Sequence, residues 1–478
     1  MSFQCVKKYE DSYDKYVLLA TSGKIVLPDY LDKESKKLAE TVIKKNKFTA
    51  KASEKISMTL VNKKKVMDFI IIGLGENKKL DAKNIRQYLF DGLKNITGKV
   101  FVSFGDKDLD NMDVIAEVVE HINYKFDKYF SKKKEEFLEV SYLTDKKVPK
   151  LIEGYELAKI SNIVKDLVNE QAEVLNPKEL ADRAAKLGKE FGFEVQILDE
   201  KKAQKLGMTA YLAVARAAHH RPYVIVMRYK GDAKSKYTYG LVGKGLTYDT
   251  GGLSLKPTES MLTMRCDMGG AATMIGAMCS IAKMKLKKNV TCVVAACENS
   301  IGPNAYRPGD ILTAMNGKTI EVTNTDAEGR LTLADALTYI VREEKVNEVI
   351  DAATLTGAVM VALGEDVTGV FTNDDKMARK VIDASENWNE YFWQMPMFDI
   401  FKKNLKSPYA DMQNTGVRWG GSTNAAKFLE EFIDDTKWVH LDIAGTAWAS
   451  GANPYYSQKG ATGQVFRTVY SYIKDSKN

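Results

Sequence analysis

The segment Asn324–Leu331, Asn-Thr-Asp-Ala-Glu-Gly-Arg-Leu, constrains the fold of this chain more than any other part of the sequence. It follows a β-branched run at residues 319–323, which predicts a strand, and it precedes an apolar pattern that predicts an amphipathic helix. Asp326 and Glu328 are two residues apart, so both carboxylates would project from one face of extended backbone. Two neighbouring acids repel each other unless a cation or a proton lies between them. The segment therefore predicts a metal site at the carboxyl end of a strand, where open α/β sheets place their chemistry, with Arg330 able to hold an anion beside it.

The composition is that of a globular protein with more than one domain. The chain has 478 residues, of which 45% are hydrophobic and 28% charged, and it is long enough for two or three sizeable cores. No apolar run approaches the roughly 20 residues that span a bilayer, and residues 1–8 lack the apolar core of a signal peptide. The five cysteines form no CxxC pair. We therefore expect a cytoplasmic protein with reduced thiols and no membrane partner.

Histidine is scarce, which narrows the kind of metal site. Only four histidines occur, and none of them belongs to an HExxH motif. The sequence therefore argues strongly against a histidine-based zinc hydrolase site. Any metal must be held mainly by oxygen ligands.

Charge and periodicity divide the chain into two parts. Residues 1–150 hold 30 Lys and Arg against 23 Asp and Glu, so the whole net charge of +7 lies in this part. Strand-like and helix-like stretches alternate throughout. We predict a basic N-terminal α/β domain at 1–149, a connecting helix at 150–172 and a larger α/β domain at 173–478. In the larger domain the alternation predicts a mainly parallel central sheet flanked by helices.

Two features of the first part allow an alternative interpretation. Gly73–Gly75 follows a predicted strand and superficially resembles a nucleotide-binding loop, but the third glycine is missing, which favours a tight turn. Lysine runs at 63–65, 132–134 and 146–147 could contact a polyanion such as DNA. They are interleaved with acids, which favours a solvated surface and leaves DNA binding as the less favoured alternative.

A second polar cluster precedes the first along the chain. Residues 242–252 follow a predicted strand and contain Lys244 and Asp249 among glycines, which let the backbone approach a ligand closely. Lys256 and Asp267 come shortly after. Taken alone, Gly-Lys-Gly is a weak signal, and it is no phosphate-binding P-loop because the GxxxxGK spacing is absent.

Together the two clusters resemble the leucyl aminopeptidase family of dinuclear metallo-exopeptidases. The resemblance covers nearly all of residues 150–478 and is looser before them. Four further segments carry it in the same order: Tyr306–Asp310, Ala353–Ala358, His440–Trp448 and Lys459–Gly463. Matches of this length and order are too specific for chance. The resemblance implies that residues 173–478 form a catalytic metallopeptidase domain and that the smaller N-terminal domain is macro-domain-like.

The resemblance also implies the ligands of two divalent metal ions. They are Lys244, Asp249, Asp267, Asp326 and Glu328, with Asp249 and Glu328 bridging the ions. A lysine ammonium has no lone pair, so Lys244 must bind as a neutral amine whose pKa is lowered by the adjacent cations. Such ligands admit Zn²⁺ or Mn²⁺, and also Mg²⁺ or Co²⁺. The alternative is an ordinary buried ion-pair network.

By the same resemblance, the protein would be an aminopeptidase that releases N-terminal residues from peptide substrates. A water between the two cations would be acidic enough to attack as hydroxide near neutral pH. Lys256 would stabilise the oxyanion of the tetrahedral intermediate. Arg330 would hold a bicarbonate that takes the water's proton, since no histidine is evidently placed to do so. The substrate pocket, whose apolar members favour leucine-like N-termini, would be lined by Met264, Asn324, Thr354, Leu355, Gly357 and Ala447.

The resemblance further implies a homohexamer. Because some bacterial relatives bind DNA, it also implies an alternative or additional role as a DNA-binding architectural or regulatory protein. The chain departs from the family at Gln171, where proline is frequent, and at Thr250, where serine is frequent, and Cys266 lies next to a metal ligand. None of these departures removes a metal ligand or a catalytic group.

Overall fold

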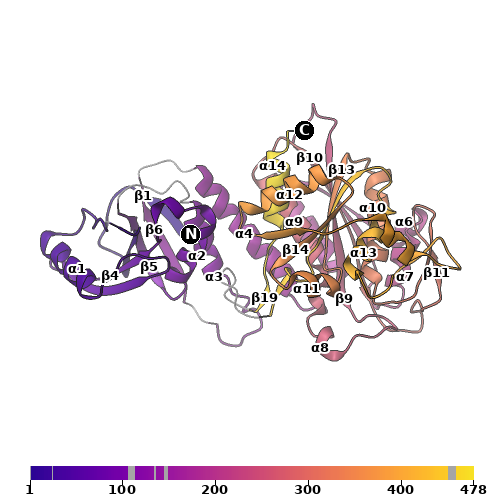
Figure 1. Ribbon diagram of the computed structural model, residues 1–478, viewed down its shortest axis with the longest axis horizontal. Helices are drawn as coiled ribbons and strands as arrows, with labels where there is room; N and C mark the ends of the chain where they lie inside the picture. Colours follow the sequence, from indigo (N-terminus) through magenta and orange to yellow (C-terminus); the bar gives the residue numbers. More distant parts are fainter. Residues whose placement is uncertain are drawn as a thin grey trace. The chain divides into compact units, whose positions relative to one another are not determined.

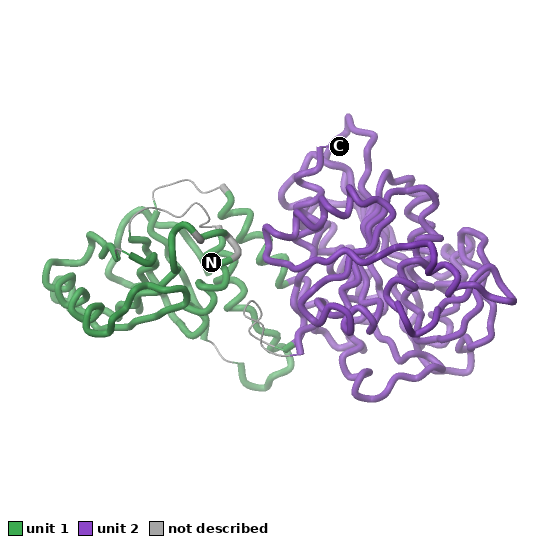
Figure 2. The backbone as a smooth tube through the Cα atoms, in the orientation of Figure 1, with its two compact units in different colours: residues 1–162, 451–459 green, residues 163–450, 460–478 purple. Residues whose placement is uncertain are grey.

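The computed structural model describes residues 2–23, 25–105, 113–133, 136–144, 149–450 and 459–477. Helices and strands alternate along most of the chain (Figure 1). The chain divides into two compact units, residues 1–162 with 451–459, and residues 163–450 with 460–478 (Figure 2). The division falls inside α4 (Pro149–Asn169), a helix of 21 residues. No helix in the described ranges is long and apolar enough to cross a membrane.

The first unit is built on a six-stranded sheet in the order β1-β6-β5-β2-β4-β3. Neighbouring strands are parallel except β3, which pairs antiparallel with β4 at one edge. Alternate side chains of β2 and β4 enter two different apolar cores, so these strands are buried on both faces. The strands are β1 (Phe3–Val6), β2 (Lys15–Ala20), β3 (Lys55–Asn62), β4 (Lys65–Gly73), β5 (Gly98–Phe104) and β6 (Leu138–Leu143). The helices are α1 (Lys33–Lys45), η1 (Asn77–Lys79), α2 (Ala82–Leu93) and α3 (Asp113–Asn123).

The second unit is built on an eight-stranded sheet in the order β15-β14-β17-β13-β9-β10-β8-β7. The central strands β17, β13, β9 and β10 are parallel to one another, and β14 is parallel to β15. The remaining neighbours, β14 with β17, β10 with β8 and β8 with β7, pair antiparallel. The strands are β7 (Glu194–Leu198), β8 (Tyr223–Lys230), β9 (Thr238–Asp249), β10 (Asn289–Asn299), β13 (Glu348–Ala353), β14 (Val367–Thr372), β15 (Tyr391–Gln394) and β17 (Lys437–Asp442).

Helices cover both faces of this sheet (Figure 1). One face packs against α7 (Thr209–Ala215), α10 (Glu328–Arg342) and α13 (Gly421–Glu430), and the other against α5 (Pro177–Phe191), α9 (Gly269–Lys283), α12 (Asp375–Glu386) and α14 (Phe466–Asp475). The shorter helices are α6 (Glu200–Lys205), α8 (Thr258–Met261), η2 (Met264–Met268), α11 (Gly357–Leu363) and η3 (Asp399–Leu405). One small sheet contains β11 (Ile311–Thr313), β12 (Thr319–Glu321) and β16 (Met412–Gln413). Another contains β18 (Trp448–Ala449) and β19 (Gly460–Ala461). The predicted fold class, two α/β domains with a mainly parallel sheet in the second, is confirmed.

Glycine allows α9 to begin directly against the central strands. A Cβ on Gly270 would lie 2.0 Å from the carbonyl O of Ala352, and a Cβ on Gly243 would lie 2.7 Å from Cα of Ala271. Real Cβ atoms do not approach that closely, so a larger residue at either position would push the helix away. The two glycines therefore bring η2 and the start of α9 alongside the part of β9 that carries Lys244.

The structure around Asn324–Leu331 differs from the local prediction. The preceding strand, β12, ends at Glu321 and belongs to a small sheet instead of the central one. Helix α10 begins at Glu328, so Asp326 lies in a turn and Glu328 in the first turn of the helix. The expectation of two carboxylates on one face of extended backbone is therefore wrong. Asn324 Oδ1 accepts a hydrogen bond from the Asp326 N–H at 2.8 Å, and such side-chain-to-backbone bonds shape turns.

Candidate metal centre

Five metal-ligand candidates converge near the carboxyl ends of the central parallel strands. Lys244 and Asp249 lie on β9, Asp267 lies in η2, Asp326 lies in the turn before α10, and Glu328 begins α10. One carboxylate oxygen from each of Asp249, Asp326 and Glu328 lies within 4.8 Å of the others. The structure thus brings together residues that are spread over 84 positions of the sequence.

Lys244 is enclosed by acceptors. Its Nζ lies 2.8 Å from Asp267 Oδ1 and 2.9 Å from Glu328 Oε1, and it donates a hydrogen bond to the carbonyl O of Thr354 at 3.0 Å. Burial alone lowers the pKa of Lys244, but the charges of the surrounding carboxylates outweigh burial and raise the pKa above its ordinary value. Gly329 makes room for this side chain, since a Cβ there would lie 2.4 Å from Lys244 Cε.

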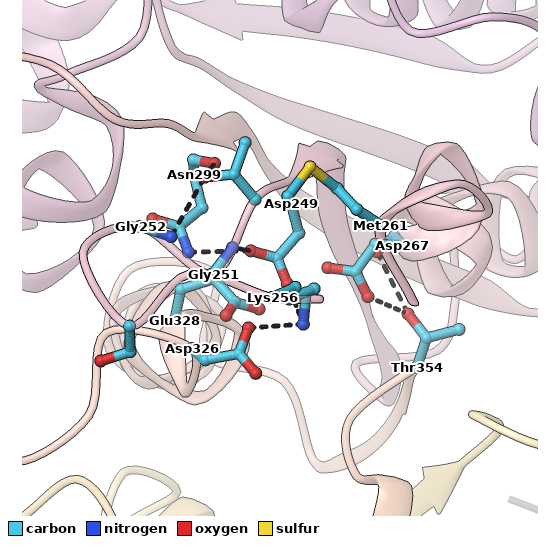
Figure 3. Close-up of polar contacts among 12 residues, drawn as sticks. Asp249, Gly251, Gly252, Lys256, Met261, Asp267, Asn299, Asp326, Glu328 and Thr354 are labelled. Atoms are coloured by element: carbon cyan, nitrogen blue, oxygen red, sulfur yellow. Dashed lines mark hydrogen bonds and ion pairs between the residues drawn. The ribbon is translucent and has the colours of Figure 1, made fainter. Parts of the chain in front are cut away.

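Lys256 lies on the loop after β9 and connects two acids of the cluster (Figure 3). Its Nζ lies 2.9 Å from Asp249 Oδ2 and 2.5 Å from Asp326 Oδ1. The Lys256 side chain is 15% exposed, whereas that of Asp249 is 2% exposed. The Asp326 side chain is 33% exposed, so Lys256 lies at an intermediate depth between its two partners.

The buried carboxylates are crowded enough to resist ionisation. Burial, and then the charge of Asp249, raise the pKa of Glu328, and burial also raises the pKa of Asp267. Two buried oxygens, Asp267 Oδ2 and Glu328 Oε2, have no hydrogen-bond partner in the described part of the chain. Buried carboxylate oxygens without donors are costly unless a cation meets them. The donor set, mostly oxygen with one amine, therefore fits divalent metal ions.

Arg330 lies in the first turn of α10, two residues after Glu328. Its Nη1 donates a hydrogen bond to the carbonyl O of Asn414 at 2.7 Å, while its buried Nε has no hydrogen-bond partner among the described residues. Burial lowers the pKa of Arg330 to about 10, which leaves the guanidinium charged at neutral pH. A buried guanidinium with an unused donor fits a small anion.

Two of the predicted pocket residues bind acids of the cluster or the backbone beside them. Thr354 Oγ1 donates a hydrogen bond to Asp267 Oδ1 at 2.7 Å (Figure 3). The Asn324 side chain accepts from the backbone of Asp326. Both side chains are therefore used in orienting acids, which the sequence does not reveal.

The other predicted pocket residues are mostly apolar and lie on neighbouring elements. Met264 begins η2 and is half-buried, and Leu355 is half-buried against the core of the second unit. Gly357 begins α11 and is exposed, and apart from its chain neighbours and its own helix backbone no atom of the described residues lies within 4 Å of the position that a Cβ would occupy there. Ala447 Cβ lies 3.2 Å from the position of a Cβ on Gly269, at the start of α9. Space for a side chain therefore remains beside Gly357.

Asn299 orients Asp249, although no motif of the sequence points to it. Asn299 ends β10 beside Asp249 in the parallel register, and its Nδ2 donates to Asp249 Oδ1 at 2.8 Å and to the carbonyl O of Thr325 at 3.1 Å (Figure 3). Tyr306 donates its hydroxyl to the same Thr325 carbonyl at 2.6 Å. The only sequence signal for Asn299 is a polar residue after an apolar strand.

The backbone N–H groups of residues 73–75 in the first unit are not free to bind a phosphate group. The backbone N–H groups of Gly73, Leu74 and Gly75 donate to carbonyl groups of Glu54, Ala20 and Ala50 at 2.7, 2.8 and 3.0 Å. A Cβ on Gly73 would lie 2.2 Å from the carbonyl O of Lys51. These backbone donors are therefore used within the first unit, which speaks against a nucleotide-binding loop, although Gly73 still belongs to β4 and residues 74–76 do not form the predicted tight turn.

The lysine runs of the first unit are partly paired with acids. Lys65 Nζ lies 2.5 Å from Asp11 Oδ2, and Lys133 Nζ lies 3.6 Å from Asp127 Oδ1. Lys134 and the run at 146–147 lie outside the described residues. These pairs are consistent with a solvated surface.

Models of the cytosol aminopeptidase family match both parts of the chain. The catalytic-domain model matches residues 162–470, and the N-terminal-domain model matches residues 17–133. The chain is 93% identical to a probable cytosol aminopeptidase of Fusobacterium nucleatum subsp. nucleatum over 478 residues, which is 100% of each chain. It is 41% identical to a probable cytosol aminopeptidase of Clostridium perfringens over 445 residues, 89% of this chain and 90% of the other.

Solved structures show the same fold along the whole chain. The bottromycin maturation enzyme BotP in complex with Mn superposes with a TM-score of 0.87 at 28% identity, covering 96% of this chain and 99% of that one. A mutant of tomato leucine aminopeptidase superposes with a TM-score of 0.85 at 32% identity, covering 100% and 97%. Since the catalytic-domain model alone matches more than half of the chain, this protein belongs to the cytosol aminopeptidase family.

Proposed function

We propose that this protein releases leucine-like residues from the N-termini of peptides and that the cluster around Lys244 and Glu328 holds two divalent metal ions. Family membership makes the chain a metal-dependent aminopeptidase that acts on peptides. One observation carries the assignment of the site: Asp267 Oδ2 and Glu328 Oε2 are buried without donors in the described chain, beside the acids Asp249 and Asp326. The four acids outnumber the two lysines paired with them, Lys244 and Lys256, so the cluster requires further positive charge, as metal ions or protons.

The proposed ligands are Lys244, Asp249, Asp267, Asp326 and Glu328, with Asp249 and Glu328 shared between the two ions. The carboxylates of the protein raise the pKa of Lys244 and keep it an ammonium. Binding a metal through this nitrogen therefore requires Lys244 to lose a proton, which the charge of the incoming cations favours. We accordingly expect metal affinity to rise with pH.

The proposed chemistry divides between the ions and the side chains. When bound, the ions supply Lewis-acid polarisation of the scissile carbonyl and lower the pKa of the attacking water. Lys256 pairs with both Asp249 and Asp326, so its cation lies at the cluster and can meet the carbonyl oxygen as negative charge develops there. Arg330, with its unused Nε donor, would hold bicarbonate, an anion able to accept the proton of the water.

The proposed preference for leucine-like N-termini rests on the apolar residues near the acids. Met264, Leu355 and Ala447 present hydrocarbon, and Gly357 leaves space for a side chain. Met in such a position adapts to unbranched and branched aliphatic groups.

We also propose a homohexamer that works in the cytoplasm with Zn²⁺ or Mn²⁺, Mg²⁺ or Co²⁺ being alternatives. The family name supports the location, and the Mn in the BotP complex supports one choice of metal.

The proposed segments of the chain are an N-terminal domain at 1–149, a connecting helix at 150–172 and a catalytic domain at 173–478. Gel filtration giving a monomer would contradict the hexamer. The comparisons give no support to DNA binding.

The test is hydrolysis of leucine anilide by metal-stripped protein with Zn²⁺ or Mn²⁺ added back. We expect activity to return with metal in the wild type and to stay absent in Glu328→Ala. Glu348→Ala is the matched control, because Glu348 is also a buried glutamate of the second unit but accepts hydrogen bonds from Tyr237 and Tyr472. Equal loss in both variants would contradict the site, and no activity with any metal would contradict the function.

A further inference from the structure

One buried residue contacts both ends of the segment that carries Asp326, Glu328 and Arg330. This residue is Asn414, which follows β16 and is fully buried. It lies 84 positions after Arg330 in the sequence. No motif of the sequence points to it.

At the start of the segment, the Asn414 side chain continues the small sheet beyond its last strand pair. β12 and β16 are parallel, and the Asn414 N–H donates to the carbonyl O of Glu321 at 2.9 Å. Beyond that point Asn414 Oδ1 accepts from the N–H groups of Thr323 at 2.8 Å and Asn324 at 3.3 Å, and Nδ2 donates to the carbonyl O of Asn324 at 2.7 Å. The side-chain amide thus takes the place of a neighbouring strand and binds both the N–H and the C=O of Asn324.

At the end of the segment, the main chain of Asn414 fixes Arg330. The carbonyl O of Asn414 accepts a hydrogen bond from Arg330 Nη1 at 2.7 Å. Hydrogen bonds to a charged donor are stronger than neutral ones, and a planar guanidinium held at one nitrogen is limited in how it can rotate. The direction of the unused Arg330 Nε therefore depends on where Asn414 lies.

The contacts of Asn414 reach the acids through Asn324. The Asn324 backbone is held by Asn414, and the Asn324 side chain accepts from the N–H of Asp326 at 2.8 Å. Loss of the Asn414 amide would leave the N–H and C=O of the half-buried Asn324 without these partners, and the segment would relax to find others. A shift of about 1 Å at a ligand is enough to weaken a metal site.

We propose that Asn414 is a positioning residue that sets Asp326 and Glu328 for metal binding and Arg330 for its anion. The proposal rests on the roles proposed above for these three residues. Residues that orient metal ligands typically cost 10–100-fold in metal affinity or activity when they are replaced. Asn414 therefore acts on the centre without touching it.

The experiment compares Asn414→Ala with Asn424→Ala in the full-length protein. Asn424 is equally buried in the same unit, and its side chain makes three hydrogen bonds to described residues: it donates to the carbonyl groups of Val417 and Trp419 and accepts from Asn404 Nδ2. The measurements are Mn²⁺ affinity by calorimetric titration, kcat and KM for leucine anilide at saturating Mn²⁺, and the thermal unfolding temperature. We expect both variants to lose stability, but only Asn414→Ala to lose about tenfold in Mn²⁺ affinity and in kcat, with KM within about twofold.

A conservative variant guards against simple misfolding. Asn414→Asp keeps the acceptor oxygen for Thr323 and Asn324 but loses the Nδ2 donor, so we expect a partial loss of Mn²⁺ affinity and kcat. If Asn414→Ala does not fold, the proposal is tested by comparing Asn414→Asp with Asn424→Ala. Mn²⁺ affinity and kcat no lower than in Asn424→Ala would overturn the proposal. Glu328→Ala is titrated in parallel, and wild-type Mn²⁺ affinity in that variant would overturn the proposed site itself.

Discussion

Thr356 donates its hydroxyl to Asp442 Oδ2 at 2.6 Å, a bond that connects the loop after β13 to the end of β17. Asp442 Oδ1 accepts further hydrogen bonds from the N–H groups of Leu355 and Ala444, both at 3.2 Å. The same loop carries Thr354, whose carbonyl accepts from Lys244. Asp442 is 1% exposed and is not among the proposed metal ligands. It holds in place a loop that forms one side of the centre.

Replacing Asp442 tests whether this loop shapes the substrate pocket. Asp442→Ala leaves the half-buried N–H groups of Leu355 and Ala444 and the buried Thr356 hydroxyl without this acceptor, and a buried donor left unpaired costs about 1–3 kcal/mol. We expect a several-fold higher KM for leucine anilide and a lower unfolding temperature. Asp442→Asn keeps an acceptor oxygen, so its KM should stay near that of the wild type. Equal KM values in the two variants would contradict this account.

Replacing Lys244 should affect stability in a way that depends on metal. Lys244→Met removes the buried counter-charge of Asp267 and Glu328, and breaking a buried ion pair costs about 3–5 kcal/mol. We expect that loss of unfolding free energy in urea with a chelator present. The loss should be larger with Mn²⁺, because the variant lacks one proposed ligand, binds Mn²⁺ more weakly and gains less stability from it. Equal losses under both conditions would speak against metal binding by these residues.

Lys256 is expected to act in the transition state more than in substrate binding. Removal of one oxyanion donor typically lowers kcat by about 10²–10³-fold. We therefore expect Lys256→Met to reduce kcat by that amount with a much smaller change in KM. The control is Lys234→Met, an exposed lysine of the same unit. A rise in KM at unchanged kcat would show that Lys256 serves binding instead.

The buried pair of His440 and Asp351 predicts a pH-dependent contribution to stability. His440 Nδ1 lies 2.7 Å from Asp351 Oδ1, and both side chains are 0% exposed. Burial alone lowers the pKa of His440, but Asp351 outweighs burial and raises the pKa above the ordinary value of 6.5. A group with a raised pKa in the folded protein stabilises the fold below its unfolded pKa, and this contribution is lost as the pH rises through the folded value.

The measurement is the difference in unfolding free energy between the wild type and His440→Gln. We expect the difference to be largest below pH 6.5 and to shrink as the pH rises above that value. Urea unfolding at a series of pH values, with chelator present throughout, gives this difference directly. A difference that stays constant with pH would mean that folding does not shift the pKa of His440, and a difference that grows as the pH rises would mean that the folded protein holds His440 neutral.

Part of the site could be predicted from sequence because its residues lie in short segments of fixed spacing. Lys244, Asp249 and Lys256 occur within thirteen positions around the end of one strand, and Asp326, Glu328 and Arg330 within five positions around the start of one helix. Their local backbone could not be predicted equally well. Extended backbone was expected at Glu328, but the helix begins there because α10 packs against the central sheet, which local pattern does not record.

The sequence by itself determined the fold class and the residue types of the centre. Strand and helix periodicities are local, and the alternation of the two admits only a layered α/β arrangement with its chemistry at the carboxyl ends of the strands. Only the tertiary structure decided which polar groups hold that centre in place. Asn299 and Asn414 reach Asp249 and Arg330 across 50 and 84 positions. An asparagine looks the same in sequence whether it ends a surface turn or fills a buried gap, because its hydrogen bonds depend on what packing brings to it.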